Sequence, residues 1–255
     1  MSNLLDLKKP SLLVLQPDSD GGPDRIYGWA AKYRVDLTVR NPAFPAEMST
    51  PVEGFDGFIV LGGEMGDGDT EEYPWLEDVR TRLREANQLG IPTLGVCLGG
   101  QLLAAALGGK VLPGDQGFET GVVEFRIQDE GIGDPLLKGV PRVFYSGAMH
   151  RDAIVRLPEG SQLLVTGERY PHQAFRCGQS WGVQFHPEVS PQSYARWAEK
   201  AELLAPGQEK LFEGTAQEFQ CLDVLVEPAS ERLVSNFFEI VRSAGETPAA
   251  GQPVE

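Results

Sequence analysis

The stretch GVCLGGQLLAAALGG, from Gly95 to Gly109, combines a cysteine, flanking glycines and a helix-forming run. The residues just before the cysteine, Ile91 to Val96, predict a short buried strand, and Leu98 to Leu107 predict a helix rich in Leu and Ala. Gly-x-Cys-x-Gly at such a junction has the layout of a nucleophile elbow, with sulfur in place of the usual oxygen. The glycines at 95 and 99 permit a sharp turn and a close approach of substrate.

Cys97, within this stretch, has two interpretations. Free cysteine is among the most buried residue types, so a structural thiol at a tight turn fits the same residues. As a nucleophile, Cys97 would lie at a helix N-terminus, where the helix dipole favours the thiolate. We favour the elbow, which requires a base and a group that orients this base elsewhere in the chain.

The residues before the elbow alternate between strand and helix patterns. We expect strands over 11–16, 35–40 and 56–63, and helices over 25–33 and 74–90. The second helix has Pro74 near its start and Gly90 just past its end, as helix termini prefer. Such alternation implies right-handed crossovers and a mostly parallel sheet.

The chain changes character after Gly109, where short strand-like runs dominate. We expect strands over 122–127, 142–147, 161–168, 173–178 and 181–189, followed by helices over 191–204 and 228–243. The fold class is therefore α/β, with an added antiparallel β region in the second half. Residues 1–243 are predicted to form a single domain, and the Pro-, Gly- and Ala-rich residues 244–255 a disordered tail.

Composition excludes several classes of function. With 41% hydrophobic and 23% charged residues, the 255-residue chain is typical of a globular protein. A net charge of −15 disfavours binding to nucleic acid phosphates. Three widely spaced cysteines (Cys97, Cys177 and Cys221) and the lack of a signal-peptide pattern predict a reducing, cytoplasmic location. No apolar stretch approaches the ~18 residues of a membrane span, so no membrane partner is expected.

The best candidate base is His186, in GVQFHPEV. If the strand persists through Pro187, His186 and Glu188 point to the same face, because strand side chains alternate. The Glu188 carboxylate could then hold the tautomer and orientation of the imidazole. A surface His–Glu pair fits the same three residues, so this motif by itself leaves both interpretations open.

A nucleophile elbow also needs donors for an oxyanion. The backbone N–H of Leu98 is one candidate. Gly62 and Gly63 follow the strand-like FIVL, and the ends of parallel strands converge on one edge of the sheet. Taken alone, the two glycines fit an ordinary strand-to-loop turn better.

Three separated motifs resemble the class I (triad) glutamine amidotransferase domain, in particular its stand-alone, GMP-synthase-like members. They are LGGEMGD with EYPWL, GVCLGGQLLAAALGG and GVQFHPEV, and the resemblance covers most of 11–189. It implies a flavodoxin-like open sheet flanked by helices. It also implies Cys97 as nucleophile, His186 as base and Glu188 as the group that orients the base, with Gly63 and Leu98 as backbone oxyanion donors.

The resemblance further implies that Gln101 and Glu119 bind the substrate. Glu64 departs from the pattern, since the family often has proline after the two glycines. His150, in MHRD, fits either a pocket wall or a structural role. His172, Cys177 and Cys221 have no counterpart and are interpreted as structural.

The activity implied by the resemblance is hydrolysis of the glutamine side-chain amide through a γ-glutamyl thioester on Cys97, with no metal and no cofactor. The ammonia would serve an unidentified acceptor, and a separate ATP-using synthetase subunit is a possible partner, since no nucleotide motif follows Val189. Two alternatives remain open, a γ-glutamyl peptidase acting on γ-glutamyl conjugates and a catalytically inactive binding module.

Overall fold

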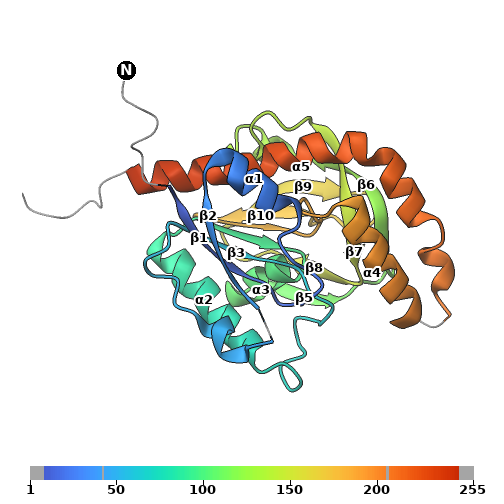
Figure 1. The fold of residues 1–255 in the computed structure, drawn as a ribbon, viewed down its shortest axis with the longest axis horizontal. Helices are drawn as coiled ribbons and strands as arrows, with labels where there is room; N and C mark the ends of the chain where they lie inside the picture. Colours follow the sequence, from blue (N-terminus) through green and yellow to red (C-terminus); the bar gives the residue numbers. More distant parts are fainter. Residues whose placement is uncertain (1–8, 42, 205–206, 247–255) are drawn as a thin grey trace, which may run out of the picture.

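A mixed nine-stranded sheet organises the molecule (Figure 1). The computed structural model describes residues 9–41, 43–204 and 207–246. The first five strands across the sheet run parallel: β2 (Asp36–Arg40), β1 (Ser11–Leu15), β3 (Gly57–Val60), β4 (Thr93–Val96) and β11 (Ser180–Val183). Their order is the 2-1-3-4-5 order of flavodoxin-like folds, in which ligands bind at the carboxyl ends of the strands.

The antiparallel region extends this sheet beyond β11. It comprises β10 (Ala174–Cys177), β9 (Gln162–Gly167), β6 (Glu119–Ile127) and β7 (Val143–His150). A separate two-stranded sheet pairs β5 (Lys110–Pro113) with β8 (Asp152–Arg156). The predicted fold class, a mostly parallel sheet with antiparallel strands added in the second half, is thus confirmed.

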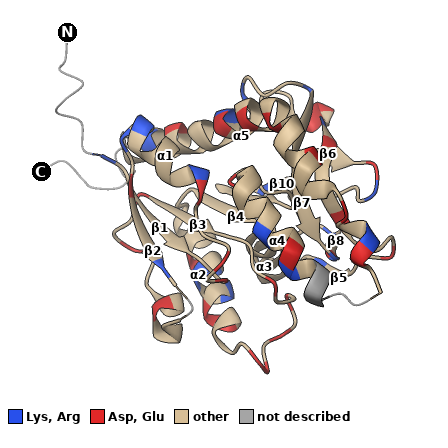
Figure 2. Ribbon diagram, turned by 45° about the vertical axis from the view of Figure 1, so that its right-hand side comes forward, with Lys and Arg blue, Asp and Glu red and all other residues tan. Residues whose placement is uncertain are grey.

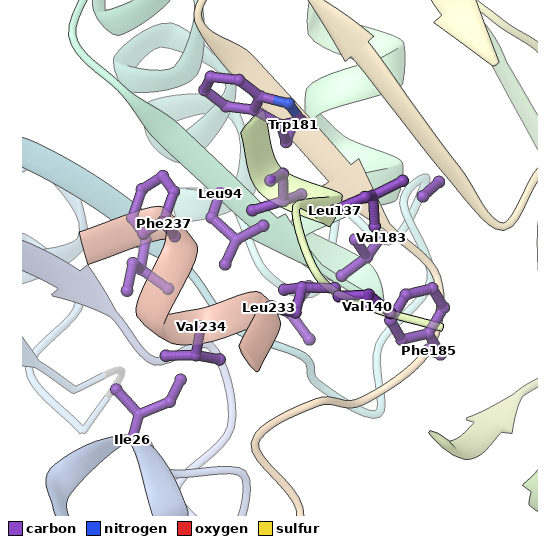
Figure 3. Packing of buried hydrophobic residues seen from close by; sticks show 14 of the residues in the cluster. Ile26, Leu94, Leu137, Val140, Trp181, Val183, Phe185, Leu233, Val234 and Phe237 are labelled. Atoms are coloured by element: carbon purple, nitrogen blue, oxygen red, sulfur yellow. The ribbon is translucent and has the colours of Figure 1, made fainter. Parts of the chain in front are cut away.

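Helices cover both faces of the sheet. The helices are α1 (Arg25–Tyr33), α2 (Trp75–Leu89), α3 (Leu98–Ala106), α4 (Pro191–Leu204) and α5 (Thr215–Glu246). Leu12 and Val14 of β1 pack in the core beneath α1 and α5, whereas Leu13 and Leu15 pack beneath α2 and α3. This alternation follows from the two-residue period of a strand. Figure 3 shows the first core, where Ile26 of α1 and Phe237 of α5 lie over the sheet.

Three details of the predicted elements are wrong. The last strand ends at Val183 and does not continue to Val189. β5 and β8 form a ladder that the sequence pattern did not indicate. The final helix begins at Thr215 and runs through Pro228, which was the predicted start. A proline inside a helix costs about 3 kcal/mol, and the apolar side chains that α5 buries along its length offset this cost.

The C-terminal end of the chain also differs from expectation. Residues 244–246, expected in the tail, belong to α5, and the remainder of the predicted tail lies outside the described residues. Within the described residues, no helix combines the length and apolar character needed to cross a membrane. Figure 2 shows acidic side chains on α2, on α5 and on exposed loops, as the negative net charge requires.

Candidate active site

Cys97 occupies a strained turn between β4 and α3. Its backbone has φ 50° and ψ −109°, a positive φ that non-glycine residues rarely adopt. Its N–H donates to the carbonyl of Val183 on β11 (2.8 Å), and its carbonyl accepts from the N–H of Gln101 in α3 (2.9 Å). The residue therefore ends the strand and starts the helix, which is the geometry predicted for an elbow.

The glycines beside Cys97 are required by space. A Cβ at Gly99 would lie 2.1 Å from the carbonyl oxygen of Val60, and one at Gly95 would lie 2.5 Å from that of Gly99. Neither position has room for a side chain, because α3 packs directly against β3 and against the strand that leads into it. The close packing holds the Cys97 backbone in its strained conformation.

His186 and Glu188 form a buried pair beside this turn. The imidazole Nδ1 lies 2.7 Å from Glu188 Oε1, and both side chains are buried. The pairing was predicted, but the reason given for it was wrong: β11 ends at Val183, and Glu188 lies in a turn. His186 instead makes an isolated antiparallel bridge to Gly147 of β7, to whose carbonyl its N–H donates (2.8 Å).

The charges around His186 favour its imidazolium form. Burial has the largest single effect on the pKa of His186 and lowers it. The negative charges of Glu188 and Cys97, and hydrogen bonds to both, act in the other direction and together raise this pKa well above its ordinary value. Since Nδ1 faces Glu188, Nε2 is the nitrogen left to exchange a proton with Cys97.

A cavity of about 330 Å³ opens over this group. It lies at the carboxyl ends of β3, β4 and β11, where the fold places ligand sites. Its wall includes Cys97, His186, Glu188, Gln101, Gly62 and Gly63, all predicted as part of the site or of its turn. A Cβ at Gly62 would lie 2.8 Å from His186 Cε1, so only glycine lets this backbone pass beside the imidazole.

The two candidate oxyanion donors lie on opposite segments of this wall. Leu98 is the first residue of α3, and the first N–H groups of a helix have no acceptor within it. Gly63 lies in the loop after β3, where a Cβ would come within 3.0 Å of Leu98 Cδ2. The loop thus packs against the residue that carries the other donor.

Gln101 lines the cavity with its amide nitrogen already engaged. Its Nε2 donates to the carbonyl of Asp152 (2.9 Å) and to Oε1 of Gln184 (3.2 Å). Nε2 of Gln184 lies 3.6 Å from Cys97 Sγ. The sequence prediction missed Gln184, although its position two residues before His186 was a usable signal.

Glu119 lies outside the cavity wall, behind His150. Its Oε2 accepts from Nε2 of Gln173 (2.7 Å) and pairs with Nε2 of His150 (2.9 Å), with all three side chains buried. His150 lines the cavity, and its Nδ1 faces the carbonyl of Asp152 (3.0 Å). Glu119 is therefore placed to hold His150, and any influence of its carboxylate on a substrate would pass through this imidazole.

The rim of the cavity joins α4 to two loops. Nζ of Lys200 lies 3.1 Å from Asp20 Oδ2 and 3.0 Å from Glu64 Oε2. The hydrogen bond to Glu64 has the largest effect on Lys200 and raises its pKa. The ring of Trp197 packs edge-on against His186, with centroids 4.9 Å apart. Trp197 and Lys200 were not predicted, since their place in the site depends on how α4 packs.

The remaining candidates lie outside the cavity wall. They are His172, Cys177 and Cys221, of which Cys177 is half-buried and Cys221 exposed. Within residues 9–41, 43–204 and 207–246, no group of three His, Cys, Asp or Glu side chains is arranged to hold a metal ion.

Comparison with known proteins places these features in a family. The family model "Glutamine amidotransferase class-I" matches residues 25–202. A subunit of glutamine-hydrolyzing GMP synthase from Archaeoglobus fulgidus is 35% identical over 150 residues, covering 56% of this chain and 73% of that protein. The glutamine-hydrolyzing GMP synthase from Syntrophomonas wolfei is 38% identical over 109 residues, which are 42% of this chain and 20% of that protein.

A solved structure shares the fold. The crystal structure of a glutamine amidotransferase from Thermotoga maritima superposes with a TM-score of 0.81 at 24% identity, covering 92% of this chain and 99% of the other. At this identity the likeness concerns the arrangement of the chain. The match to the family model covers both the elbow and the segment that carries His186 and Glu188.

Proposed function

Because this chain belongs to the class-I glutamine amidotransferase family, we propose that it hydrolyses the side-chain amide of glutamine at Cys97. The observation that carries the proposal is the strained elbow of Cys97 beside the buried His186–Glu188 pair, all in one cavity. A catalytically inactive module would have no need to keep an imidazolium beside a strained thiol.

The proposed reaction begins with attack of the Cys97 thiolate on the amide carbon, while the cysteine proton resides on His186. The oxyanion that forms accepts hydrogen bonds from the backbone N–H groups of Gly63 and Leu98, each worth about 3 kcal/mol of the barrier. His186 then gives its proton to the leaving nitrogen, and ammonia departs. The product on the enzyme is a γ-glutamyl thioester.

Water completes the reaction. His186 accepts a proton from the water that attacks the thioester, and the Cys97 thiolate leaves as glutamate is released. Glu188 keeps Nδ1 of His186 protonated throughout, so that Nε2 serves as base and then as acid. No other group has to change its protonation in this cycle.

Recognition of the glutamyl part is assigned to the wall beside Gln101. Both amide hydrogens of Gln101 face acceptors in the protein, so its Oε1 is the atom left for a substrate donor. An ammonium group at the α-carbon of glutamine is a donor of this kind. Gln101 is therefore the proposed contact for the amino end of the substrate.

The ammonia is proposed to pass to a separate, ATP-using synthetase partner. The support is the set of relatives whose names denote one subunit of a glutamine-hydrolyzing GMP synthase, of which the chain covers about three quarters. In the longer protein named as the whole glutamine-hydrolyzing GMP synthase, the match spans a fifth of the length, so the remainder has no counterpart in it.

A second function is favoured by the outer part of the cavity. Phe118, Met149 and Trp197 line it with apolar surface that free ammonia does not need. A γ-glutamyl peptidase would use the same thioester and place a bulky leaving group against these side chains. Hydrolysis of γ-glutamyl conjugates is therefore the alternative.

A substrate panel tests the proposal. The isolated protein and Cys97→Ala are each assayed with glutamine, γ-glutamyl amides and γ-glutamyl peptides. We expect slow hydrolysis of glutamine, lost in Cys97→Ala and accelerated by a synthetase partner. A kcat/KM for a γ-glutamyl peptide far above that for glutamine would replace the glutaminase by the peptidase. Activity that persists in Cys97→Ala would contradict both.

A further inference from the structure

The backbone of His186 is held by β7 beyond the end of β11. The N–H of His186 donates to the carbonyl of Gly147 (2.8 Å), and its carbonyl accepts from the hydroxyl of Ser146 (3.3 Å). With β11 already ended at Val183, these two bonds link the imidazole to the sheet. The position of Gly147 therefore helps to set the position of His186 relative to Cys97.

Phe219 of α5 packs on the other side of Gly147. A Cβ at Gly147 would lie 2.7 Å from Phe219 Cε2 and 2.8 Å from Val189 Cγ1. Phe219 is fully buried, and its ring stacks on Tyr194 of α4 with centroids 4.7 Å apart. Val189, the residue after Glu188, belongs to the same apolar cluster. The ring thus touches the strand that holds His186 and belongs to the cluster that surrounds the residue after Glu188.

The arrangement is built from elements far apart in the chain. In Figure 1, the N-terminal part of α5 runs beside β7 and α4. This helix begins at Thr215, outside the residues 25–202 matched by the family model. Phe219 has no polar side-chain atom and does not line the cavity, so any effect on the chemistry must pass through packing.

We infer that Phe219 is a positioning residue, which holds Gly147 and Val189 and thereby sets His186 and Glu188 against Cys97. The C-terminal helix is then a working part of the site and more than a cover for the sheet. The inference rests on the proposed roles of Cys97 and His186, but it does not depend on which γ-glutamyl compound is the substrate.

A matched pair of variants tests this inference. Phe219→Leu removes the ring atoms that touch Gly147, whereas Phe237→Leu makes the same change on the same helix at a fully buried position in the other core. Both are made in a chain whose only cysteine is Cys97, with Cys177→Ser and Cys221→Ser. The rate of Cys97 alkylation by iodoacetamide is followed across pH, together with the melting temperature.

We expect Phe219→Leu to lower the alkylation rate at neutral and mildly acidic pH by about tenfold, since a misplaced base no longer supports the thiolate. Phe237→Leu should lower the melting temperature by a similar amount and leave the alkylation profile unchanged. Equal effects of both variants on alkylation, or no effect of Phe219→Leu in a folded protein, would overturn the inference. Because alkylation needs no substrate, this outcome is distinct from a failure to hydrolyse glutamine.

Discussion

Cys97 and His186 face the same cavity, but different forces fix them. Cys97 is held by its backbone: a positive φ, a strand on one side, a helix on the other, and glycines with no room for a Cβ. His186 lies on an irregular segment and is held by hydrogen bonds from β7, by Glu188, and by the edge contact with Trp197. The nucleophile therefore depends on the local chain, and the base depends on contacts between distant elements.

This difference makes the two halves of the site vulnerable to different substitutions. Additions of a methyl group should damage the elbow, because close packing leaves no space for it. Truncations and charge changes should damage the base, because partner side chains hold it in place. The following substitutions test this division.

The largest expected effect is on the nucleophile itself. Cys97→Ala should lower glutamine turnover by roughly 10⁴-fold or more, because no covalent path remains. Cys97→Gly should lose activity equally but unfold with a free energy about 1 kcal/mol higher than Cys97→Ala, since glycine adopts a positive φ without strain. Steady-state assays and thermal unfolding measure the two quantities. Equal stability of the alanine and glycine variants would argue against strain at the elbow.

The next effect is on the packing of the elbow. Gly99→Ala should reduce the free energy of unfolding by about 3 kcal/mol or more, because its Cβ would meet the Val60 carbonyl at 2.1 Å. Gly28→Ala in α1 is the control, since its Cβ meets nothing within 4 Å. This control should be more stable than wild type by about 0.5–1 kcal/mol. Denaturant unfolding of both variants decides whether the constraint is specific to the elbow.

A smaller effect is expected at the base. Glu188→Gln keeps the shape of the side chain but removes the charge that opposes the effect of burial on His186, so the pKa of His186 should fall. Activity should decrease by about 10²-fold, less than in Cys97→Ala. A pH profile of Cys97 alkylation should show the labelling at mildly acidic pH reduced. An unchanged profile would show that Glu188 does not act on the imidazole charge.

The same shift has a consequence for stability. The pKa of His186 is raised on folding above its ordinary ~6.5, so its stabilising contribution is complete below that pH and is lost as pH rises through the raised value. Wild type should therefore lose more stability between neutral and alkaline pH than Glu188→Gln. Melting temperatures of both proteins across this window provide the test, and parallel curves would contradict it.

The smallest effect is expected at the rim. Glu64 stands where the family often has proline, and its pair with Lys200 ties the loop of Gly63 to α4. Both side chains are partly exposed, so the pair is worth at most about 1 kcal/mol. Lys200→Gln should lower kcat/KM a few-fold, an effect that high salt should remove. Lys32→Gln, which breaks the exposed pair with Glu231, is the control and should leave kcat/KM unchanged.

The contrast between the two halves also explains what the sequence could predict. The elbow was predictable because strand, turn, glycines and helix are consecutive in the chain. The His186–Glu188 pair was predicted from a strand that does not continue, and it forms because β7 binds the segment instead. Glu119 was assigned to the substrate from its motif alone, since sequence does not tell on which side of the wall a side chain lies.

Residues that act through tertiary packing were beyond reach. Trp197, Lys200 and Phe219 carry no local motif, and their importance depends on where α4 and α5 lie. Gln184 is the exception, because it shares the alternation that singled out His186. Pro228 misled the placement of α5, since the burial of apolar side chains overrides the cost of a proline inside the helix.

The central claim, that Cys97 carries the γ-glutamyl group, is tested most directly by trapping the intermediate. The protein is mixed with glutamine, quenched in acid during turnover, digested and examined by mass spectrometry. A γ-glutamyl adduct on the peptide that contains Cys97, absent from Cys97→Ala and released by hydroxylamine, is the predicted result. Turnover of glutamine with no adduct on this peptide, or with an adduct on Cys177 or Cys221, would contradict the account.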